Sequence, residues 1–242
     1  ANTHPNLPLA RGQQPCPARY RYAHSLTVMP SDISRGNTMY LFGGFRELIS
    51  VPRSDLWAIK GSPFNMSLTG NATTLADLVH GWSELSRDWR EESSNWTLDC
   101  RWNMFDASRQ SPGPRAFHYA LPISDTVILI GGGSCNSSWM TAGDNVTLMR
   151  DFWWFNTQSK QWKRIGLLDI DPPFRSTAVV YNGQVYIFGG GVWPKTLSNA
   201  VYKVLLPTYP NTSETIQTIK MQSTAGMDGE PEPRAMHSAV VS

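Results

Sequence analysis

A short apolar segment that stops on glycines occurs three times in this 242-residue chain. The copies are TMYLFGG at Thr38–Gly44, TVILIGGG at Thr126–Gly133 and QVYIFGGG at Gln184–Gly191. Self-similarity at a long period is typical of repeat architectures, in which each copy forms one supersecondary unit. The residues Met39–Phe42 are apolar at every position and do not alternate, which is typical of a strand covered on both faces. The sequence therefore predicts three similar β units that cover one another.

Further landmarks recur in a fixed order around each copy. An Arg lies upstream of each glycine run, followed in two copies by His three residues later: Arg21 and His24, Arg115 and His118, then Arg175 with Ala178 in the place of His. Downstream, a strand opens on Asp or Asn and carries aromatic residues: Asp55–Trp57, Asp151–Trp153, Asn199–Tyr202. Two bulky apolar residues three apart come last: Trp82 and Leu85, Trp162 and Ile165, Ile216 and Ile219. A fourth copy opens at residues 231–234 and reaches His237.

This order of landmarks resembles the kelch repeat, in which each repeat supplies one four-stranded blade of a β-propeller. The resemblance implies an all-β fold over residues 1–242, a kelch-type propeller with three blades and the first strand of a fourth. The expected boundaries are about 17–86 for blade 1, about 112–166 for blade 2, about 172–222 for blade 3 and about 231–242 for the start of blade 4. Propellers close with about four to eight blades, so either the chain belongs to a longer polypeptide or other copies complete the ring. We expect the longer polypeptide, because the pattern stops within an expected strand at residues 238–241.

The resemblance also assigns landmark roles to single residues. These blade landmarks are Gly43, Gly44, Trp57, Trp82, Arg115, His118, Gly131, Gly132, Trp162, Gly189, Gly190, Arg234 and His237. The third copy departs from the pattern, because Ala178 replaces the His and Ile216 replaces the late Trp. The strand pattern around both positions persists, so the departures affect single landmarks and not the expected fold.

The N-glycosylation signal Asn-x-Ser/Thr is unusually frequent in this sequence. Six of the asparagines lie in Asn-x-Ser/Thr, where chance would give about two: Asn65, Asn71, Asn95, Asn136, Asn145 and Asn211. On the repeat pattern all six fall between strands, where a bulky glycan projects into water. We therefore expect N-linked glycans and an extracellular protein, either secreted or displayed at the cell surface. Unused signals in a cytosolic protein are the alternative.

The three cysteines are too few for a disulfide scaffold, and their number is odd. In an up-and-down blade, the loop after the second strand and the connection between blades lie at the same end. Cys135 follows a glycine run and Cys100 lies in the connection into the same blade, so the resemblance predicts a Cys100–Cys135 disulfide. Cys16 is then free or paired outside this chain. Three reduced, buried thiols are the alternative.

Charge and hydropathy predict neither a nucleic-acid partner nor a membrane span in this segment. The net charge is only +2, and Lys and Arg are scattered along the chain. No apolar run approaches the roughly 18 residues that a membrane span needs. The Arg–x–x–His pairs first suggest an active site. A catalytic site normally draws unlike residues from several loops, whereas this pair occurs three times along the chain, so we expect it to be structural.

The sequence predicts neither of two kinds of metal site that kelch-like proteins contain. Glu84, Asp88 and Glu92 share a four-residue spacing, which in some kelch-like iron-binding proteins is joined by a His; that His is missing, and Glu84 falls on an expected strand. Copper-radical oxidases also resemble kelch propellers and need two His and two Tyr ligands, one Tyr bonded to Cys. No local motif here links such residues. We expect no catalytic residue and no cofactor, with such an oxidase as the alternative.

The remaining expectation is a module that binds other proteins or further domains of the same polypeptide. Long loops on a rigid scaffold suit recognition. The insertion Arg87–Gln110 is rich in tryptophan, a residue that dominates binding hot spots or folds back over apolar surface: Trp89, Trp96 and Trp102. The sequence thus predicts a non-catalytic scaffolding propeller in adhesion, matrix or surface-appendage assembly. A cytosolic kelch adaptor is a further alternative.

Overall fold

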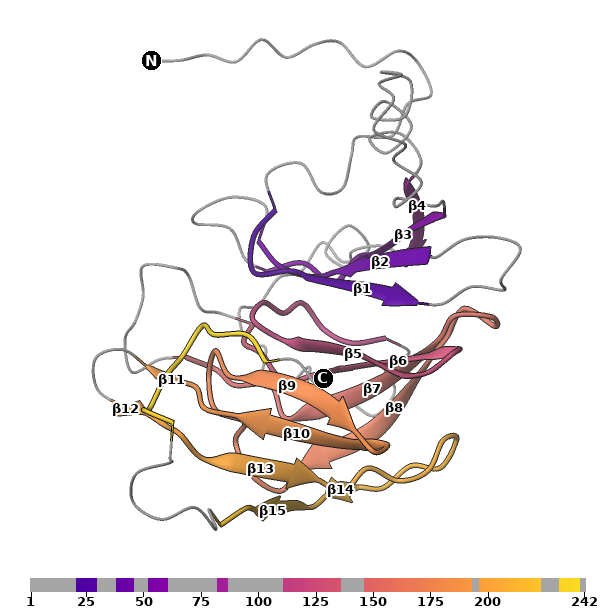
Figure 1. Cartoon of the computed structure of the whole chain (residues 1–242). Helices are drawn as coiled ribbons and strands as arrows, with labels where there is room; N and C mark the ends of the chain where they lie inside the picture. Colours follow the sequence, from indigo (N-terminus) through magenta and orange to yellow (C-terminus); the bar gives the residue numbers. More distant parts are fainter. Residues whose placement is uncertain are drawn as a thin grey trace, which may run out of the picture.

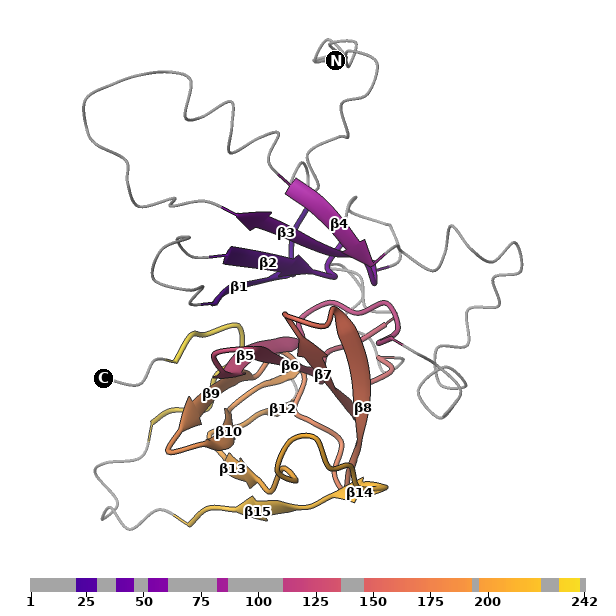
Figure 2. The ribbon, with the colours of Figure 1, turned by 90° about the vertical axis from the view of Figure 1, so that its right-hand side faces the viewer.

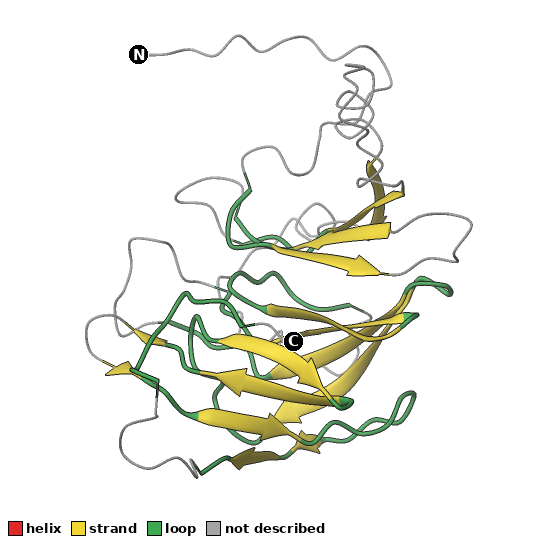
Figure 3. Ribbon diagram, in the orientation of Figure 1, coloured by secondary structure: helices red, strands yellow, loops and turns green. Residues whose placement is uncertain are grey.

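The fold is built from β-strands, arranged as sheets that lie one upon another (Figures 1 and 2). A computed structural model describes residues 21–29, 38–45, 52–60, 82–86, 111–135, 146–192, 196–222 and 231–239. Within these ranges no residue is helical (Figure 3), and accordingly none of them contains a helix that could span a bilayer. The all-β class expected from the sequence is therefore confirmed.

Three antiparallel sheets, here called sheets 1 to 3, each take their strands in sequence order. Sheet 1 consists of β1 (Ser25–Met29), β2 (Thr38–Phe42), β3 (Leu56–Lys60) and β4 (Trp82–Ser86). Sheet 2 consists of β5 (Tyr119–Ser124), β6 (Val127–Gly131), β7 (Asp151–Asn156) and β8 (Gln161–Leu168). Sheet 3 consists of β9 (Thr177–Tyr181), β10 (Gln184–Phe188), β13 (Val201–Val204) and β15 (Thr218–Lys220). A hairpin of β11 (Gly191–Val192) and β12 (Thr196–Leu197) extends from sheet 3.

The local sequence explains these strands. The glycine-terminated segments form β2, β6 and β10, and every residue of β6 is buried, as expected for a strand covered on both faces. Asn182 and Gly183 join β9 to β10 with φ values of +50° and +69°. Positive φ at both central residues is the mark of the type I′ turn, which Asn-Gly favours because it matches the twist of a hairpin.

Two apolar layers hold the sheets together. Between sheets 1 and 2, residues such as Tyr40, Phe42 and Leu56 pack against Ile128 and Ile130. Between sheets 2 and 3, aromatic residues of β7 meet the aliphatic residues of β10: Phe152, Trp154, Val185 and Ile187. The first strands β1, β5 and β9 lie next to one another along one side of the stack.

The connection from β13 to β15 ties sheet 3 to sheet 2. Its short strand β14 (Thr215–Ile216) pairs in parallel with the end of β8 and becomes the fifth strand of sheet 2. Ile216 is 1% exposed within the core between these sheets, whereas Ile219 on β15 is 48% exposed. The repeat pattern of the sequence predicts that Ile216 takes the place of Trp82 and Trp162 in the outer strand of the third copy, and this prediction is wrong. The strand register instead puts Thr218 opposite Val204, as Trp162 lies opposite Phe155.

The glycines that end the second strands are displaced by one residue in sheet 2. Gly43 and Gly44 have positive φ in sheet 1, and the corresponding residues of sheet 2 are Gly132 and Gly133, with φ of +65° and +84°. Gly131, one of the two expected landmarks, is instead the last residue of β6. A Cβ atom there would lie 2.5 Å from the ring of Phe152, so the aromatic ring fills the space of the missing side chain.

We predict that Gly133→Ala destabilises the protein much more than Gly183→Ala. Both positions have positive φ, which costs an alanine about 1–2 kcal/mol. At Gly133 the new Cβ would also lie 2.6 Å from the Ala116 carbonyl oxygen, whereas at Gly183 nothing lies within 4 Å. Urea unfolding of the two variants measures the difference. Equal losses of unfolding free energy would contradict the close contact at Gly133.

Candidate functional site

Sheets 1 and 2 each contain a buried polar cluster of the same composition, here called the Arg–Asp–Trp unit. In sheet 1 the guanidinium of Arg21 donates two hydrogen bonds of 2.7 Å to the two carboxylate oxygens of Asp55. The same guanidinium donates to the Gly43 carbonyl at 2.8 Å, and the Trp57 indole donates to Asp55 Oδ2 at 2.7 Å. The unit therefore joins the segment before β1, the end of β2 and the start of β3.

The same unit recurs in sheet 2 with deeper burial. Arg115 Nη2 lies 2.7 Å from Asp151 Oδ2, and their side chains are 0% and 2% exposed. The Trp153 indole donates to Asp151 Oδ2 at 2.6 Å, and Arg115 Nη1 donates to the Gly132 carbonyl at 3.3 Å. A charged pair this deep persists only when it is matched and hydrogen-bonded.

The surroundings of Asp55 in sheet 1 favour the ionised form of its carboxylate. Burial by itself would raise the pKa of Asp55, but the hydrogen bonds and positive charge of Arg21 outweigh it, with help from the Trp57 indole and Arg53. The pKa of Asp55 is therefore lowered from its usual value. An ionised, fully bonded carboxylate has no proton to donate and little freedom to accept one, which makes it a structural group.

Sheet 3 lacks the whole unit, and this corrects the alignment of the third copy. Phe174 contacts Gly191 through the same backbone hydrogen bond that joins Tyr22 to Phe45 and Ala116 to Ser134. The residue before it, in the place of Arg21 and Arg115, is therefore Pro173 and not Arg175. By the pairing of β10 with β13, the place of the Asp is taken by Ala200 and not Asn199, and that of the Trp by Tyr202.

Arg175 has a different role from the one that the sequence comparison gave it. Its φ of +56° matches Ala23 and Phe117, the residues two positions after Arg21 and Arg115. Its guanidinium carbon lies 4.8 Å from the ring centroids of Phe117 and of Phe174. A guanidinium against aromatic faces gains cation–π attraction. The place of His24 and His118 is consequently taken by Ser176, and Ala178 lies within β9.

His118 bridges sheets 1 and 2. Its Nε2 lies 2.8 Å from Ser25 Oγ, and its ring meets Phe42 edge-on with centroids 5.3 Å apart. Burial and the nearby positive charge of Arg115 lower the pKa of His118 well below its usual value. The imidazole is therefore neutral at neutral pH. It serves as a packed hydrogen-bonding group between two sheets.

In the equivalent contact between sheets 2 and 3, the large and the small side chain exchange places. Here the small residue, Ser176, stands in the place of His118, and the large one, Tyr119, stands in the place of Ser25. The Tyr119 hydroxyl is hydrogen-bonded to Ser176 Oγ. Burial raises the pKa of Tyr119, so its hydroxyl keeps its proton. The same polar bridge between neighbouring sheets is thus made with the large and small partners exchanged.

Sequence reasoning found the arginines, histidines and tryptophans of this site but missed their partner. The sequence pattern marks Asp55 and Asp151 only as the residues that open a strand. The signal was available, because the Asp follows the Arg by 34 and 36 residues in the two sheets and precedes a Trp by two residues. This recurring spacing marks the Asp but does not show which residue it contacts, because the Arg lies more than 30 positions away; the pairing of the strands shows the contact.

Most other predicted sites fall outside the described residues. This holds for five glycosylation signals, the Trp-rich insertion, two cysteines and two carboxylates: Asn65, Asn71, Asn95, Asn136, Asn145, Trp89, Trp96, Trp102, Cys16, Cys100, Asp88 and Glu92. Glu84 lies on β4, opposite Trp57. Among the described residues, no group of three or more His, Cys, Asp or Glu side chains could hold a metal ion.

Two of the predicted sites can be located in part. Asn211 is exposed in the turn between β13 and β14, where its backbone amide donates to the Thr208 carbonyl. Cys135 is 1% exposed and disulfide-bonded, packed near Met149 and Leu167. The other two cysteines lie outside the described ranges, so the pairing of Cys135 with Cys100 stays a prediction.

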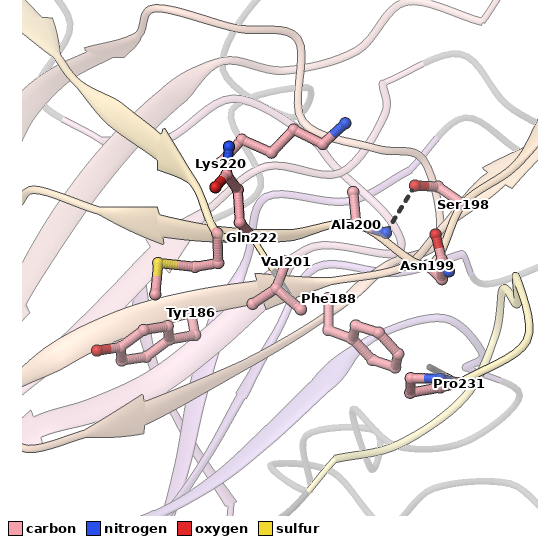
Figure 4. A pocket seen from close by; sticks show the side chains of 10 residues that line it. Tyr186, Phe188, Ser198, Asn199, Ala200, Val201, Lys220, Gln222 and Pro231 are labelled. Atoms are coloured by element: carbon pink, nitrogen blue, oxygen red, sulfur yellow. Dashed lines mark hydrogen bonds between the residues drawn. The ribbon is translucent and has the colours of Figure 1, made fainter. Parts of the chain in front are cut away.

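A cleft lies on the face of sheet 3 that is turned away from sheet 2 (Figure 4). It encloses about 580 Å³ and is lined by Tyr186, Phe188 and Val201, with Pro231 at its edge. Ser198, at its polar end, accepts a hydrogen bond from the Ala200 amide (Figure 4). A second cleft of about 280 Å³ continues over Val179 and Tyr181. The larger cleft thus combines apolar side chains with four polar ones, Ser198, Asn199, Lys220 and Gln222, whereas the lining of the smaller cleft is mainly apolar.

Comparison with known proteins places the fold but not the function. Scans against protein-family models and curated proteins give no match. Among solved structures, that of YjhT is similar, with 12% identical residues and a TM-score of 0.50. The likeness covers 89% of this chain and 54% of YjhT, so the chain spans about half the length of that protein. At this identity the likeness concerns the fold alone.

We predict that Asp151→Asn costs about 3–5 kcal/mol, because it leaves the buried charge of Arg115 without its counter-ion. Asp171→Asn is the matched control: that carboxylate is 71% exposed and 3.9 Å from Arg150. An exposed pair contributes about 0–1 kcal/mol. Denaturant unfolding of both variants measures the costs. Similar small losses would show that the buried pair is not a major source of stability.

We predict a loss of stability below pH 6.5 that depends on His118. The unfolded chain binds a proton at this residue near pH 6.5, whereas the folded protein, whose His118 pKa is lowered, does not. The free energy of unfolding is therefore unaffected above this pH and falls below it, by up to about 1.4 kcal/mol per pH unit, until the folded pKa is reached.

His118→Gln should reduce this pH dependence, measured as the urea midpoint between pH 7.5 and pH 5. A residual slope from His24 is expected, because burial and Arg21 also lower the pKa of that residue. An unchanged slope in His118→Gln would contradict the assignment.

Proposed function

We propose that the protein is a non-catalytic interaction module, a kelch-type β-propeller of an extracellular glycoprotein. Its three sheets would be blades, with the boundaries expected from the sequence and a fourth blade starting near residue 231. Three observations support this arrangement. Each sheet takes four strands in sequence order, the first strands β1, β5 and β9 are neighbours, and the segment before each first strand makes equivalent backbone contacts.

The observation that carries the non-catalytic function is the repetition of the Arg–Asp–Trp unit. In each of two sheets an Arg, an Asp and a Trp occupy equivalent places with little exposure, and in both the Arg and the Trp donate to the Asp carboxylate. Active sites draw unlike residues together at one place. Residues that recur in equivalent positions hold the scaffold, and recognition is then left to the loops.

The surroundings of Asn211 and Cys135 support the extracellular location. A glycan needs an exposed loop, and Asn211 lies in one. Disulfides persist in oxidising compartments and are rare in the cytosol, and Cys135 is disulfide-bonded. Together with the other glycosylation signals, these features favour a secreted or surface-displayed protein that holds neighbouring proteins in an adhesion, matrix or surface-appendage assembly. The Trp-rich insertion is the proposed contact region.

The intact mass of the protein from its own organism, before and after enzymatic removal of N-glycans, tests this proposal. We expect a clear loss of mass on treatment. In a secretory expression host, Asn211→Gln and Ser213→Ala should each remove one glycan. Thr212→Ala, which keeps the Asn-x-Ser signal, should retain it. An untreated mass that matches the unmodified sequence would contradict the extracellular proposal and favour a cytosolic adaptor.

A further inference from the structure

The loop that joins β13 to β14 carries an exposed tyrosine beside a glycosylation signal. It comprises residues 205–214 and extends beyond the end of β13 (Figure 1). The backbone amide of Asn211 donates to the Thr208 carbonyl at 2.8 Å, so residues 208–211 form a β-turn with Tyr209 at its second position. Tyr209 is 41% exposed, and Asn211 is also exposed. An aromatic ring and a possible point of glycan attachment thus share one tight turn.

Two contacts with β7 fix the orientation of the Tyr209 ring. The ring lies edge-on to the ring of Trp154, with centroids 5.2 Å apart and an angle of 73° between the ring planes. The Tyr209 hydroxyl accepts a hydrogen bond of 3.1 Å from Asn156 Nδ2. A side chain that is already held in place loses little further freedom when it binds a ligand. The exposed part of the ring is therefore a preformed apolar surface.

The backbone on both sides of Asn211 is fixed as well. Before it lies the hydrogen-bonded turn, and after it the Ser213 amide donates to the Ile165 carbonyl of β8 at 2.8 Å. The loop lies close to β8 because residue 166 is a glycine. A Cβ atom at Gly166 would lie 1.9 Å from the Ser213 carbonyl oxygen. A sugar bonded to Asn211 therefore starts from a defined place.

The first sugar of a glycan on Asn211 can reach the Tyr209 ring. The two residues are two positions apart, so their Cα atoms are separated by at most about 7 Å. That distance is comparable to the length of an asparagine side chain with one sugar ring attached. The C–H groups of N-acetylglucosamine form an apolar face with slight positive charge, and the face of an aromatic ring is negatively polarised. Contact between them also removes apolar area from water.

We propose that Tyr209 is a carbohydrate platform, on which the innermost N-acetylglucosamine of a glycan at Asn211 packs. The inference rests on the glycosylation proposed above. Tyr209 packs on Trp154, which is 1% exposed and belongs to the core between sheets 2 and 3. The sugar therefore reinforces the end of this core and holds the loop between β13 and β14 against sheet 2. The glycan is a structural element here as well as a surface modification.

Tyr181 provides the matched control. It is 51% exposed, and its ring lies 6.4 Å from that of Tyr186. The asparagine that follows it, Asn182, is in the sequence Asn-Gly-Gln, which is not a glycosylation signal. A single sugar on Asn211 should therefore change the surroundings of Tyr209 and leave those of Tyr181 unchanged.

Hydroxyl-radical footprinting tests the proposal on the 242-residue chain from a secretory host that makes high-mannose glycans. Three samples are compared: the glycosylated chain, the same chain trimmed by an endoglycosidase to one N-acetylglucosamine at each site, and the variant Asn211→Gln. We expect Tyr209 to be oxidised several-fold more slowly in the first two samples than in the variant, because one sugar is enough to cover the ring. Tyr181 should react equally in all three.

Urea unfolding gives a second measurement. We expect a higher urea midpoint for the trimmed glycoprotein than for Asn211→Gln. The same gain should remain when Tyr209→Phe is present in both proteins, because the ring is kept, and it should disappear when Tyr209→Ala is present in both. Each comparison is made with and without the sugar, so the direct effect of the Tyr209 substitution cancels. An equal gain with Tyr209→Ala would contradict the platform.

Equal oxidation of Tyr209 in the trimmed glycoprotein and in Asn211→Gln would overturn the proposal, since the sugar would then project into water. A chain whose Asn211 stays unmodified in the secretory host would also overturn it. Failure of the proposed function gives a different result. A natural protein without N-glycans would contradict the extracellular function, whereas protection of Tyr209 by the sugar, measured in the secretory host, would stand.

Discussion

The second and third strands of sheet 2 bury apolar side chains on both faces, so sheet 2 could not be stable in water by itself. All five residues of β6 are buried, which requires sheet 1 on one side and sheet 3 on the other. Burial of apolar area is the dominant favourable term in folding. The stacking of sheets 1 and 3 on sheet 2 follows from this requirement, whereas sheet 3 is covered on one face only.

The polar units fix the ends of strands within that apolar stack. Arg115 and Asp151 are both buried, and removing one of them would leave an unpaired charge. Sheet 3 avoids this penalty because Arg, Asp and Trp are replaced together, by Pro173, Ala200 and Tyr202. A buried ion pair exchanged as a whole for apolar groups is often neutral in stability. The third copy therefore keeps the fold while losing the landmark.

The contacts between sheets show the same joint exchange. His118 with Ser25 and Ser176 with Tyr119 each supply one long and one short polar side chain across an interface. Close-packed interiors tolerate a change of volume at one position only when a neighbour compensates for it. The sheet 2 to sheet 3 interface has room for Tyr119 because Gly132 lies beneath its ring, where a Cβ would approach within 2.6 Å.

The sequence alone determined the repeat and the strand class, because apolar runs and glycines act through local backbone preferences. It also pointed to the arginines and histidines. Only the tertiary structure decided that Arg21 pairs with Asp55, that Pro173 and Ala200 take these places in the third sheet, and that Ile216 joins sheet 2. These assignments depend on strand register and on contacts between residues more than 30 positions apart. In the third sheet the Arg and the Asp are replaced, so the sequence pattern no longer marks their places. Only the backbone pairing there identifies the equivalent residues.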